Sequence, residues 1–332
     1  MPLKKTKLSI YVLLLTNLLA CTLMIHPAGA ALTSGHISTH YYITTDGTQL
    51  PLKIWQPPKQ EIKYVIIALH GFNDYSNFFQ QPGNYFIQYN AISYAYDQRG
   101  FGESPRPGLW AGVDTYIDDL KNFIQLVKNK HPNTPIYLLG ESMGGAIIIT
   151  AMARSDLLAV NGIILAAPAL WARQTMPWYQ NALLWILSHT VPWLKVTSDG
   201  LEIQASDNIE MLKALGQDPL VIKETRVEAI YGLVNLMDQA LSSANAITAN
   251  TLLLYGEKDE IIPEEPTYQF LHHFTESGKN NLMIAFYVNG YHMLLRDLQA
   301  AVLWNDITAW INSVNAPLPS GADKRALLLL GK

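Results

Sequence analysis

The sequence predicts an α/β fold built on a mainly parallel sheet, because short apolar runs alternate with amphipathic segments along the chain. The runs lack the strict polar–apolar alternation of a half-exposed strand, so we expect them to be buried on both faces, as in a parallel sheet. Most of them end at a glycine or an aspartate, which favours strands over fragments of helix. The six runs lie at residues 64–69, 91–96, 136–139, 162–166, 251–255 and 283–288.

Segments with helical spacing separate these runs. Between residues 113 and 127, apolar side chains recur at steps of three and four and form one face, and Pro132 ends the segment. A similar pattern between residues 294 and 310 predicts a final helix. Residues 35–45 and 49–55 alternate more clearly, with a typical Asp-Gly hairpin turn between them, so we expect an antiparallel pair at one edge of the sheet.

Composition bounds the class of protein. The chain has 332 residues, of which 49% are hydrophobic and 15% charged, which is apolar for a soluble protein but far from a multi-span membrane protein. The net charge of -4, without a long run of one sign, gives no indication of nucleic-acid binding. Cys21 is the single cysteine in the sequence, which excludes an intramolecular disulfide and any metal site built on several cysteines.

The N-terminus has the pattern of a secretory signal. Three lysines among the first residues precede an apolar run at 8–20, which ends in small residues. Residues 18–21, with the letters LLAC, resemble a bacterial lipobox, in which the cysteine is lipidated after cleavage, although Leu19 stands where a smaller residue is commoner. The sequence therefore predicts an exported protein, anchored to the membrane of a bacterial envelope through a lipidated Cys21.

Two alternatives to the lipoprotein remain open at this point. Cleavage after Ala30, in the A-x-A pattern at 28–30, predicts a periplasmic or secreted protein. An uncleaved anchor over residues 8–25 approaches the length that spans a bilayer. Residues 1–30 are accordingly assigned to a signal segment.

The rest of the chain predicts one catalytic domain over residues 36–314. It is interrupted at about 170–245 by a segment that is rich in tryptophan and leucine and has no strand-like run, which predicts a helical cap inserted between two core strands. Residues 315–332 contain proline, glycine and a short leucine run, and we expect a loosely ordered tail there.

The segment 140–144, with the letters GESMG, carries the chemistry. It follows the third apolar run directly and precedes a plausible helix, which is the context of a nucleophile elbow rather than of a chance GxSxG. The turn is so sharp that side chains at Gly140 and Gly144 would collide with neighbours. Ser142 would be held in a strained conformation with its hydroxyl exposed, and the helix N-terminus would favour negative charge there. We expect Ser142 to be a nucleophile.

A serine hydroxyl needs a base, and the base needs a carboxylate that orients it. His292 and Asp259 each follow a predicted strand closely, which places both at the edge of the sheet that carries Ser142. The chain order serine, aspartate, histidine is the order expected for a serine hydrolase of this architecture. Glu257 and Glu260 are the competing carboxylates, as solvated loop residues.

An oxyanion hole is also expected, since negative charge develops on the carbonyl oxygen in the transition state. One donor is the backbone N–H of Met143, directly after the nucleophile. The other is expected from the loop after the first apolar run, where we choose the N–H of Phe72. His70, in the same loop, is expected to be a buried structural residue.

Six segments together resemble the monoacylglycerol lipase and lysophospholipase branch of the α/β-hydrolase family, sometimes grouped with the serine aminopeptidases of type S33. The resemblance spans residues 41–314. The segments are 69–72 (LHGF), 97–104 (DQRGFGES), 140–145 (GESMGG), 167–170 (APAL), 256–259 (GEKD) and 290–292 (GYH).

The resemblance implies an α/β-hydrolase fold with a mainly parallel eight-stranded sheet, flanking helices and a helical cap, or lid. It also implies Ser142, Asp259 and His292 as the triad, and Phe72 and Met143 as oxyanion donors. Residues 72–75 (FNDY) depart from the pattern, since many relatives have a smaller residue there, followed by an acidic residue and a histidine. The tryptophan-rich cap differs as well, so family membership does not define the substrate.

The predicted reaction is hydrolysis of a carboxylic ester in a lipid-like substrate, a monoacylglycerol or a lysophospholipid, through an acyl-enzyme. It needs no metal or organic cofactor. Trp171, Trp178 and Trp185 of the cap are candidates for lining an acyl-chain pocket. The competing interpretation is that these tryptophans only pack the cap onto the core.

Two other functions compete with the esterase. An aminopeptidase or amidase on the same scaffold would need a carboxylate for the free amine of its substrate, and Glu202, Asp207 and Glu210 in the cap are candidates. A non-catalytic ligand-binding protein of this fold usually lacks a member of the triad, whereas this sequence contains all three.

Overall fold

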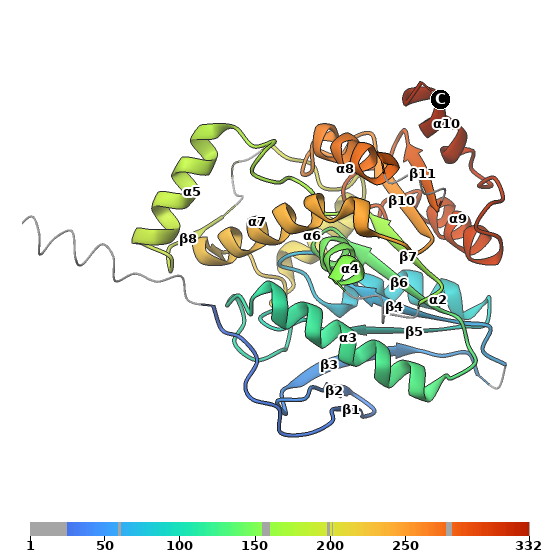
Figure 1. The fold of residues 1–332 in the computed structure, drawn as a ribbon, viewed down its shortest axis with the longest axis horizontal. Coiled ribbons are helices and arrows are strands. Elements are labelled where there is room, and N and C mark those ends of the chain that lie inside the picture. The colour runs from blue at the N-terminus through green and yellow to red at the C-terminus, as the bar shows by residue number, and fades with distance from the viewer. Residues whose placement is uncertain are drawn as a thin grey trace, which may run out of the picture.

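A central sheet of nine strands dominates the described part of the chain, which comprises residues 25–58, 61–154, 160–197, 200, 202–276 and 281–331 of a computed structural model. The strand order is β1-β2-β3-β5-β4-β6-β7-β10-β11 (Figure 1). The strands are β1 (His36–Ile37), β2 (Tyr41–Ile43), β3 (Gln49–Trp55), β4 (Tyr64–Leu69), β5 (Ala91–Tyr96), β6 (Ile136–Glu141), β7 (Gly162–Ala166), β10 (Thr251–Gly256) and β11 (Leu282–Tyr287).

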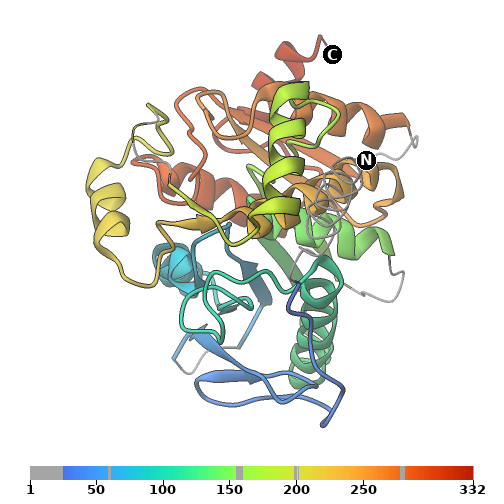
Figure 2. The ribbon, with the colours of Figure 1, turned by 90° about the vertical axis from the view of Figure 1, so that its left-hand side faces the viewer.

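Helices cover both faces of the sheet (Figures 1 and 2). The core on one face includes side chains of α3, α4, α7 and α8, and the core on the other face includes side chains of α2 and α9. The helices are α2 (Gln80–Ile87), α3 (Val113–Lys130), α4 (Met143–Arg154), α5 (Trp178–Thr190), α6 (Ile209–Gln217), α7 (Val227–Ser242), α8 (Glu264–Glu276), α9 (Ala300–Asn312) and α10 (Ala322–Leu329), with short 3-10 turns η1 (Ser76–Phe79) and η2 (Ala244–Ala246). The prediction of an α/β fold is confirmed.

The two-sided burial explains the continuous apolar runs. In β4, Val65 and Ile67 belong to the core under α3 and α4, whereas Tyr64 and Ile66 belong to the core under α2 and α9. Each predicted run lies on a strand, and β4 pairs in parallel with both β5 and β6. Because both faces are covered, such a strand does not show the alternation of polar and apolar residues that a half-exposed strand has.

The antiparallel edge also forms as the hairpin signal predicts. β2 pairs with β3, with Ile43 opposite Gln49, and the Gly47 N–H donates to the Thr44 carbonyl in the turn. The described sheet has one strand more than the eight expected. The addition is β1, whose two residues pair with β2 and are too few to produce a pattern in the sequence.

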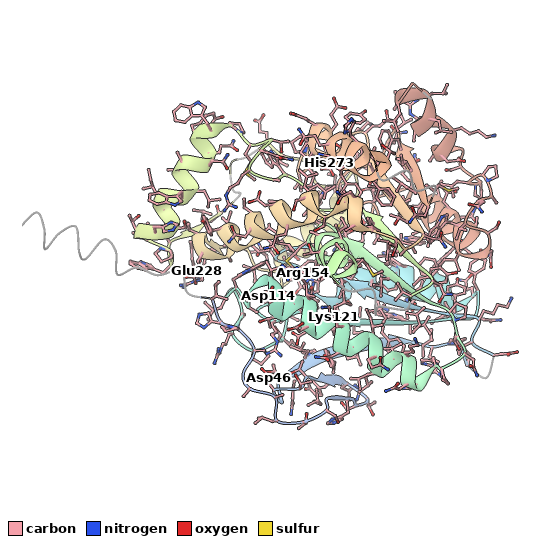
Figure 3. All side chains as sticks on the ribbon, in the orientation of Figure 1. Asp46, Asp114, Lys121, Arg154, Glu228 and His273 are labelled. Atoms are coloured by element: carbon pink, nitrogen blue, oxygen red, sulfur yellow. The ribbon has the colours of Figure 1, made fainter. Side chains whose placement is uncertain are left out.

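The cap contains α5, α6 and α7, as expected for a helical insertion. It also contains a small antiparallel pair, β8 (Lys195–Val196) with β9 (Thr225–Arg226), which the sequence did not indicate because each strand has only two residues. α7 is mostly buried and packs against α4, so this end of the insertion belongs to the core. Arg154, in the last turn of α4, pairs with Asp114 of α3 at 2.6 Å and also contacts Gln239 of α7 (Figure 3).

The C-terminal segment is more ordered than the loosely ordered tail expected for residues 315–332. Residues 322–329 form α10, which packs against β11. Ala326 is fully buried and Leu318 nearly so, and the Ser320 N–H donates to Asp306 of α9 at 3.0 Å. The short leucine run forms the last turn of this helix, in which Ala322 and Ala326 are buried and Leu328 is exposed.

The N-terminal predictions fall largely outside the described residues. The lipobox, Cys21 and most of the signal segment lie in residues 1–24. Among the residues that are described, no helix is long and apolar enough to cross a membrane.

Candidate active site

Ser142 lies at the sharp turn from β6 into α4. Its φ of 52° is in the left-handed region, which is uncommon for a residue with a side chain and is held here by surrounding hydrogen bonds. The Ser142 N–H donates to the Ala166 carbonyl at 3.0 Å, and the Ser142 carbonyl accepts from Ala146 in the first turn of α4 at 3.1 Å. The geometry is that of a nucleophile elbow.

The glycines on either side make this turn possible. A Cβ atom on Gly144 would lie 2.2 Å from the backbone oxygen of Leu69 in β4. A Cβ atom on Gly140 would lie 2.4 Å from the backbone nitrogen of Gly145. Both distances are far below van der Waals contact, so the GxSxG spacing is required by the packing of strand, turn and helix.

His292 and Asp259 are hydrogen-bonded to each other. The distance from His292 Nδ1 to Asp259 Oδ2 is 2.8 Å, and the two side chains are 6% and 0% exposed. The other carboxylate oxygen, Oδ1, accepts the N–H groups of Ile261 and Ile262 at 2.8 and 2.9 Å. A carboxylate held in this way accepts the proton of Nδ1, which leaves Nε2 of His292 as the proton acceptor.

The surroundings of His292 also determine how easily it is protonated. Burial alone would lower the pKa of His292, but the charge and hydrogen bond of Asp259, aided by Glu141, outweigh it and raise the pKa above 6.5. An imidazole with a raised pKa holds a proton more readily, which is what a general base must do during a reaction.

Ser142 and His292 both line one cavity of about 460 Å³. Beyond these two and a small group of charged residues, the wall is mainly apolar. The apolar side chains come from the core loops and from the cap, and they are Phe72, Ala169, Trp171, Ile203, Leu215, Val221, Leu233, Met237, Ile261, Ile262 and Met293.

The two predicted oxyanion donors flank Ser142. Met143 is the first residue of α4, and Phe72 belongs to the loop after β4. A Cβ atom on Gly71, the residue before Phe72, would lie 3.4 Å from the Cβ atom of Ser142, so this loop lies against Ser142. Within the described residues, neither the Met143 N–H nor the Phe72 N–H has a hydrogen-bond partner. Both N–H groups are therefore available to a bound oxygen.

His70 is a structural residue, as expected. It is fully buried, its Nε2 accepts the Gln98 N–H at 2.9 Å, and its Nδ1 lies 2.8 Å from the Gly71 carbonyl. Burial lowers the pKa of His70, so the ring is neutral and donates from Nδ1. Both nitrogens are thus committed to holding the loop that carries Phe72.

A buried charge cluster beside Ser142 was not identified from the sequence. Arg296 Nη2 lies 2.6 Å from Asp74 Oδ2 and 2.9 Å from Glu141 Oε2, and all three side chains are at most 8% exposed. Burial raises the pKa of Glu141, and the Arg296 charge opposes this shift. All three residues line the cavity. The only available signal was a carboxylate next to Ser142 and an arginine four residues after His292.

The cap tryptophans differ in position. Trp171 lines the cavity together with Ser142. Trp178 is 80% exposed and Trp185 is 57% exposed, and neither belongs to the cavity wall. Both lie on α5, which stands at the edge of the molecule (Figure 1). Of the three predicted substrate contacts, the structure therefore brings only Trp171 to the site.

The cap carboxylates considered for an amine site also lie away from this cavity wall. Glu202 and Glu210 are exposed, and Asp207 accepts the Leu298 N–H at 2.8 Å. The Glu260 side chain does reach the cavity, and it accepts the Gln204 N–H at 2.7 Å.

Comparisons with known proteins identify the family and the fold. A family model described as serine aminopeptidase, S33, matches residues 60–299, which include Ser142, Asp259 and His292. The monoacylglycerol lipase of Mycolicibacterium smegmatis is 25% identical over 282 residues, covering 83% of this chain and 97% of that protein. Human monoglyceride lipase is 23% identical over 283 residues, covering 83% of this chain and 91% of that protein.

Solved structures show the same fold. The crystal structure of monoacylglycerol lipase from Paleococcus ferrophilus has a TM-score of 0.66 at 23% identity and covers 80% of this chain and 98% of its own. A soluble variant of Saccharomyces cerevisiae monoglyceride lipase, in complex with a substrate analog, has a TM-score of 0.69 at 19% identity, with 87% and 98% covered. The chain therefore has the α/β-hydrolase fold and belongs to the serine aminopeptidase S33 family.

Proposed function

We propose that this chain is a serine esterase that cleaves carboxylic esters of lipid-like substrates, a monoacylglycerol or a lysophospholipid, through an acyl-enzyme. The observation that carries the proposal is the single cavity in which Ser142 and His292 face a mainly apolar wall. Such a wall suits an acyl chain, while the polar end suits an ester group. The relatives named monoacylglycerol lipase, which match this chain over most of its length, support the same class.

The proposed reaction begins with attack of Ser142 Oγ on the ester carbonyl carbon, while Nε2 of His292 takes the hydroxyl proton. Asp259 keeps the ring in the required tautomer and stabilises its positive charge. The N–H groups of Phe72 and Met143 donate to the developing oxyanion. This step forms the bond between the serine oxygen and the acyl carbon.

The tetrahedral intermediate then collapses, and the alcohol leaves with the proton from His292. Water attacks the acyl-enzyme with His292 again acting as base, and the fatty acid and free Ser142 are released. The residues of this chain carry out every proton transfer in the sequence. Trp171 contacts the acyl chain in this scheme, since it is the tryptophan of the three candidates that reaches the cavity.

An ester fits the site better than a peptide with a free amine. An aminopeptidase needs an unpaired carboxylate near the nucleophile. The cavity-lining Asp74 and Glu141 already share Arg296, and Glu260 already accepts a backbone N–H. The three cap carboxylates named above are outside the cavity wall. These contacts favour the esterase over the amidase.

A substrate panel tests the proposal. Purified protein is assayed with p-nitrophenyl esters of increasing chain length, monoacylglycerols, lysophospholipids and aminoacyl anilides, with Ser142→Ala as control. We expect turnover of the esters, best with acyl chains long enough to fill the apolar wall, and loss of it in the variant. Cleavage of the anilides alone would establish an amidase, and binding without turnover of any substrate would establish a non-catalytic protein.

Export with lipidation at Cys21 is also part of the proposal. Residues just after it pack onto the body of the protein: the His26 N–H donates to the Trp110 carbonyl at 2.8 Å, and the Gly29 N–H donates to Asp46 at 2.8 Å. Cleavage before Cys21 keeps both contacts, whereas cleavage after Ala30 removes them. The intact mass of the mature protein distinguishes the two, since only the lipoprotein starts at a diacylated cysteine.

Helix α5 supports attachment to a membrane. Its 13 residues include no Asp, Glu, Lys or Arg, and large apolar side chains face solvent, with Trp178 80%, Leu183 55% and Ile186 50% exposed. Figure 1 shows α5 at the same end of the molecule as the start of the described chain, in deep blue. A lipid anchor at Cys21 would hold this end against the bilayer, where tryptophan is favoured at the interface.

Vesicle binding of protein made without the lipid tests this surface. Burial of a large apolar side chain stabilises by roughly 1.5–3 kcal/mol, so Trp178→Gln is expected to weaken binding to phosphatidylglycerol vesicles about tenfold or more. Leu328→Gln on α10, where the side chain is 79% exposed, is the matched control and should leave binding unchanged. Equal binding of the wild type and both variants would exclude α5 as the lipid-contacting surface.

A further inference from the structure

A short irregular segment of the cap runs between the two loops that carry the predicted acid and base. We call this segment, residues 203–208, the strap. The Gln204 N–H donates to Glu260 at 2.7 Å, and the Met293 N–H donates to the Ala205 carbonyl at 2.9 Å. Glu260 directly follows the acid in the chain, and Met293 directly follows the base. The strap therefore contacts both loops at the residue next to the reacting side chain.

The centre of the strap is a fully buried hydrogen bond. Ser206 is 0% exposed, and its Oγ donates to Asp297 Oδ1 at 2.6 Å. The second oxygen of Asp297 accepts the Tyr291 N–H at 2.8 Å. Burial raises the pKa of Asp297 to about 6, although both hydrogen bonds act in the opposite direction. The carboxylate thus links the strap to the residue that precedes His292.

The rest of the strap continues along the same loop. The Asn208 side-chain amide donates to the Arg296 carbonyl at 3.0 Å, and the Leu298 N–H donates to Asp207 at 2.8 Å. At the other end, Ile203 lines the cavity. One segment therefore forms part of the substrate wall and is hydrogen-bonded to the loop of the base.

His292 needs such support because of its place in the fold. Residues 288–299 form turns between β11 and α9, so neither a strand nor a helix orients the ring. Its two neighbours in the chain are each held by a hydrogen bond, Tyr291 by Asp297 of the same loop and Met293 by Ala205 of the strap. A misplacement of about 1 Å in a catalytic group costs on the order of 10²-fold in rate.

We infer that the strap is a positioning element for the base: Ser206, through Asp297, and the Ala205 carbonyl hold the main chain on both sides of His292, so that the cap must be docked for the triad to be aligned. The inference rests on the proposed function. It assigns Ser206 and Asp297 as positioning residues, which act through His292 and touch no substrate. Docking of the cap thereby both completes the substrate wall and orients the base.

Ser206→Ala tests the inference, because it removes the buried donor and leaves the cavity wall unchanged. The assay uses p-nitrophenyl acetate, which is too short to need the acyl-chain wall, and active sites are counted by fluorophosphonate titration. We expect kcat per active site to fall about 10- to 100-fold with KM unchanged. The pH midpoint of kcat/KM should also move down, because a looser contact with Asp259 raises the pKa of His292 less.

Two further variants separate positioning from stability. Ser188→Ala is the matched control, since Ser188 is also fully buried in the cap and donates to the Trp185 carbonyl of α5. It should leave kcat and the pH midpoint unchanged. Asp297→Asn keeps an oxygen for the Tyr291 N–H and a polar partner for Ser206, so it should retain most of the activity. If Ser206→Ala does not fold, Asp207→Ala replaces it in the same assay, and we expect a smaller fall in kcat.

A wild-type kcat and pH midpoint in Ser206→Ala, with only a lower melting temperature, would overturn the inference and leave the strap a structural contact. The same result in Asp207→Ala would overturn it where Ser206→Ala does not fold. Failure of the wild-type protein to cleave any ester would instead refute the proposed function. The two failures are therefore distinguishable.

Discussion

Replacing Asp259 with asparagine is expected to change the tautomer of His292 while leaving the fold intact. Oδ1 of Asp259 accepts two backbone N–H groups, from Ile261 and Ile262, and these donors require an oxygen at that position. In Asp259→Asn the amide oxygen therefore stays there and the NH₂ group points at Nδ1 of His292. Nδ1 must then accept, so the proton moves to Nε2.

A protonated Nε2 cannot take the proton of Ser142. The loss expected from this change of tautomer is about 10⁴-fold in kcat, which corresponds to about 5.4 kcal/mol of transition-state stabilisation. The hydrogen bonds around position 259 are retained in number, since each donor still meets an acceptor. We therefore expect the free energy of unfolding to change by less than about 1 kcal/mol.

The assay is steady-state hydrolysis of p-nitrophenyl butyrate, with urea unfolding measured on the same samples. Glu257→Gln is the matched control, because it makes the same chemical change two residues away, where the carboxylate pairs with Arg325 on the surface. It should keep nearly full activity. A kcat for Asp259→Asn within tenfold of the wild type, or an equal loss in Glu257→Gln, would refute the reasoning.

Three further predictions concern the elbow, the charge cluster and the pH profile. Gly144→Ala should destabilise the protein by several kcal/mol in urea titrations or prevent folding, because its Cβ atom would lie 2.2 Å from a backbone oxygen. Gly216→Ala in α6, with open space around it, is the control and should be neutral or stabilise by up to about 1 kcal/mol. Arg296→Met should cost about 3–5 kcal/mol in the same titration, since it leaves two buried carboxylates without their cation, and the additional change Glu141→Gln should restore part of it. kcat/KM should fall with decreasing pH through a midpoint above 6.5, because protonated His292 cannot act as a base. Glu141→Gln should move that midpoint down, because it removes a charge that raises the pKa of His292. A midpoint that moves up or stays would contradict the assignment of His292 as the base.

Much of the fold was predictable because parallel strands covered on both sides leave a strong local signal. The run 64–69 coincides with β4, and the run 91–96 coincides with β5. The hairpin at Asp46 and Gly47 is equally local. In contrast, α10 packs on β11 through a few small residues, and the two-residue strands β1, β8 and β9 carry no pattern at all.

The candidate site was predictable where residues follow strand ends. Ser142, Asp259 and His292 each follow a strand of the sheet, and the carboxyl ends of parallel strands meet at one edge. The charge cluster was not predictable, because Arg296 and Glu141 are 155 residues apart and meet only in the folded chain. The strap has no periodicity, and its role depends entirely on partners from other loops. Trp178 and Trp185 lie on α5, whose place at the edge of the molecule (Figure 1) could not be predicted from the sequence, whereas Trp171 lines the cavity.

The central claim is that Ser142 forms the covalent acyl-enzyme. Reaction with a fluorophosphonate probe followed by peptide mass spectrometry tests it most directly, on wild-type protein and on Ser142→Ala with a matched unfolding curve. The account predicts stoichiometric labelling of the wild type on the peptide that contains Ser142, slowed when an ester substrate is present in excess, and no labelling of the variant. Labelling of both proteins to the same extent, or on a different serine, would contradict it.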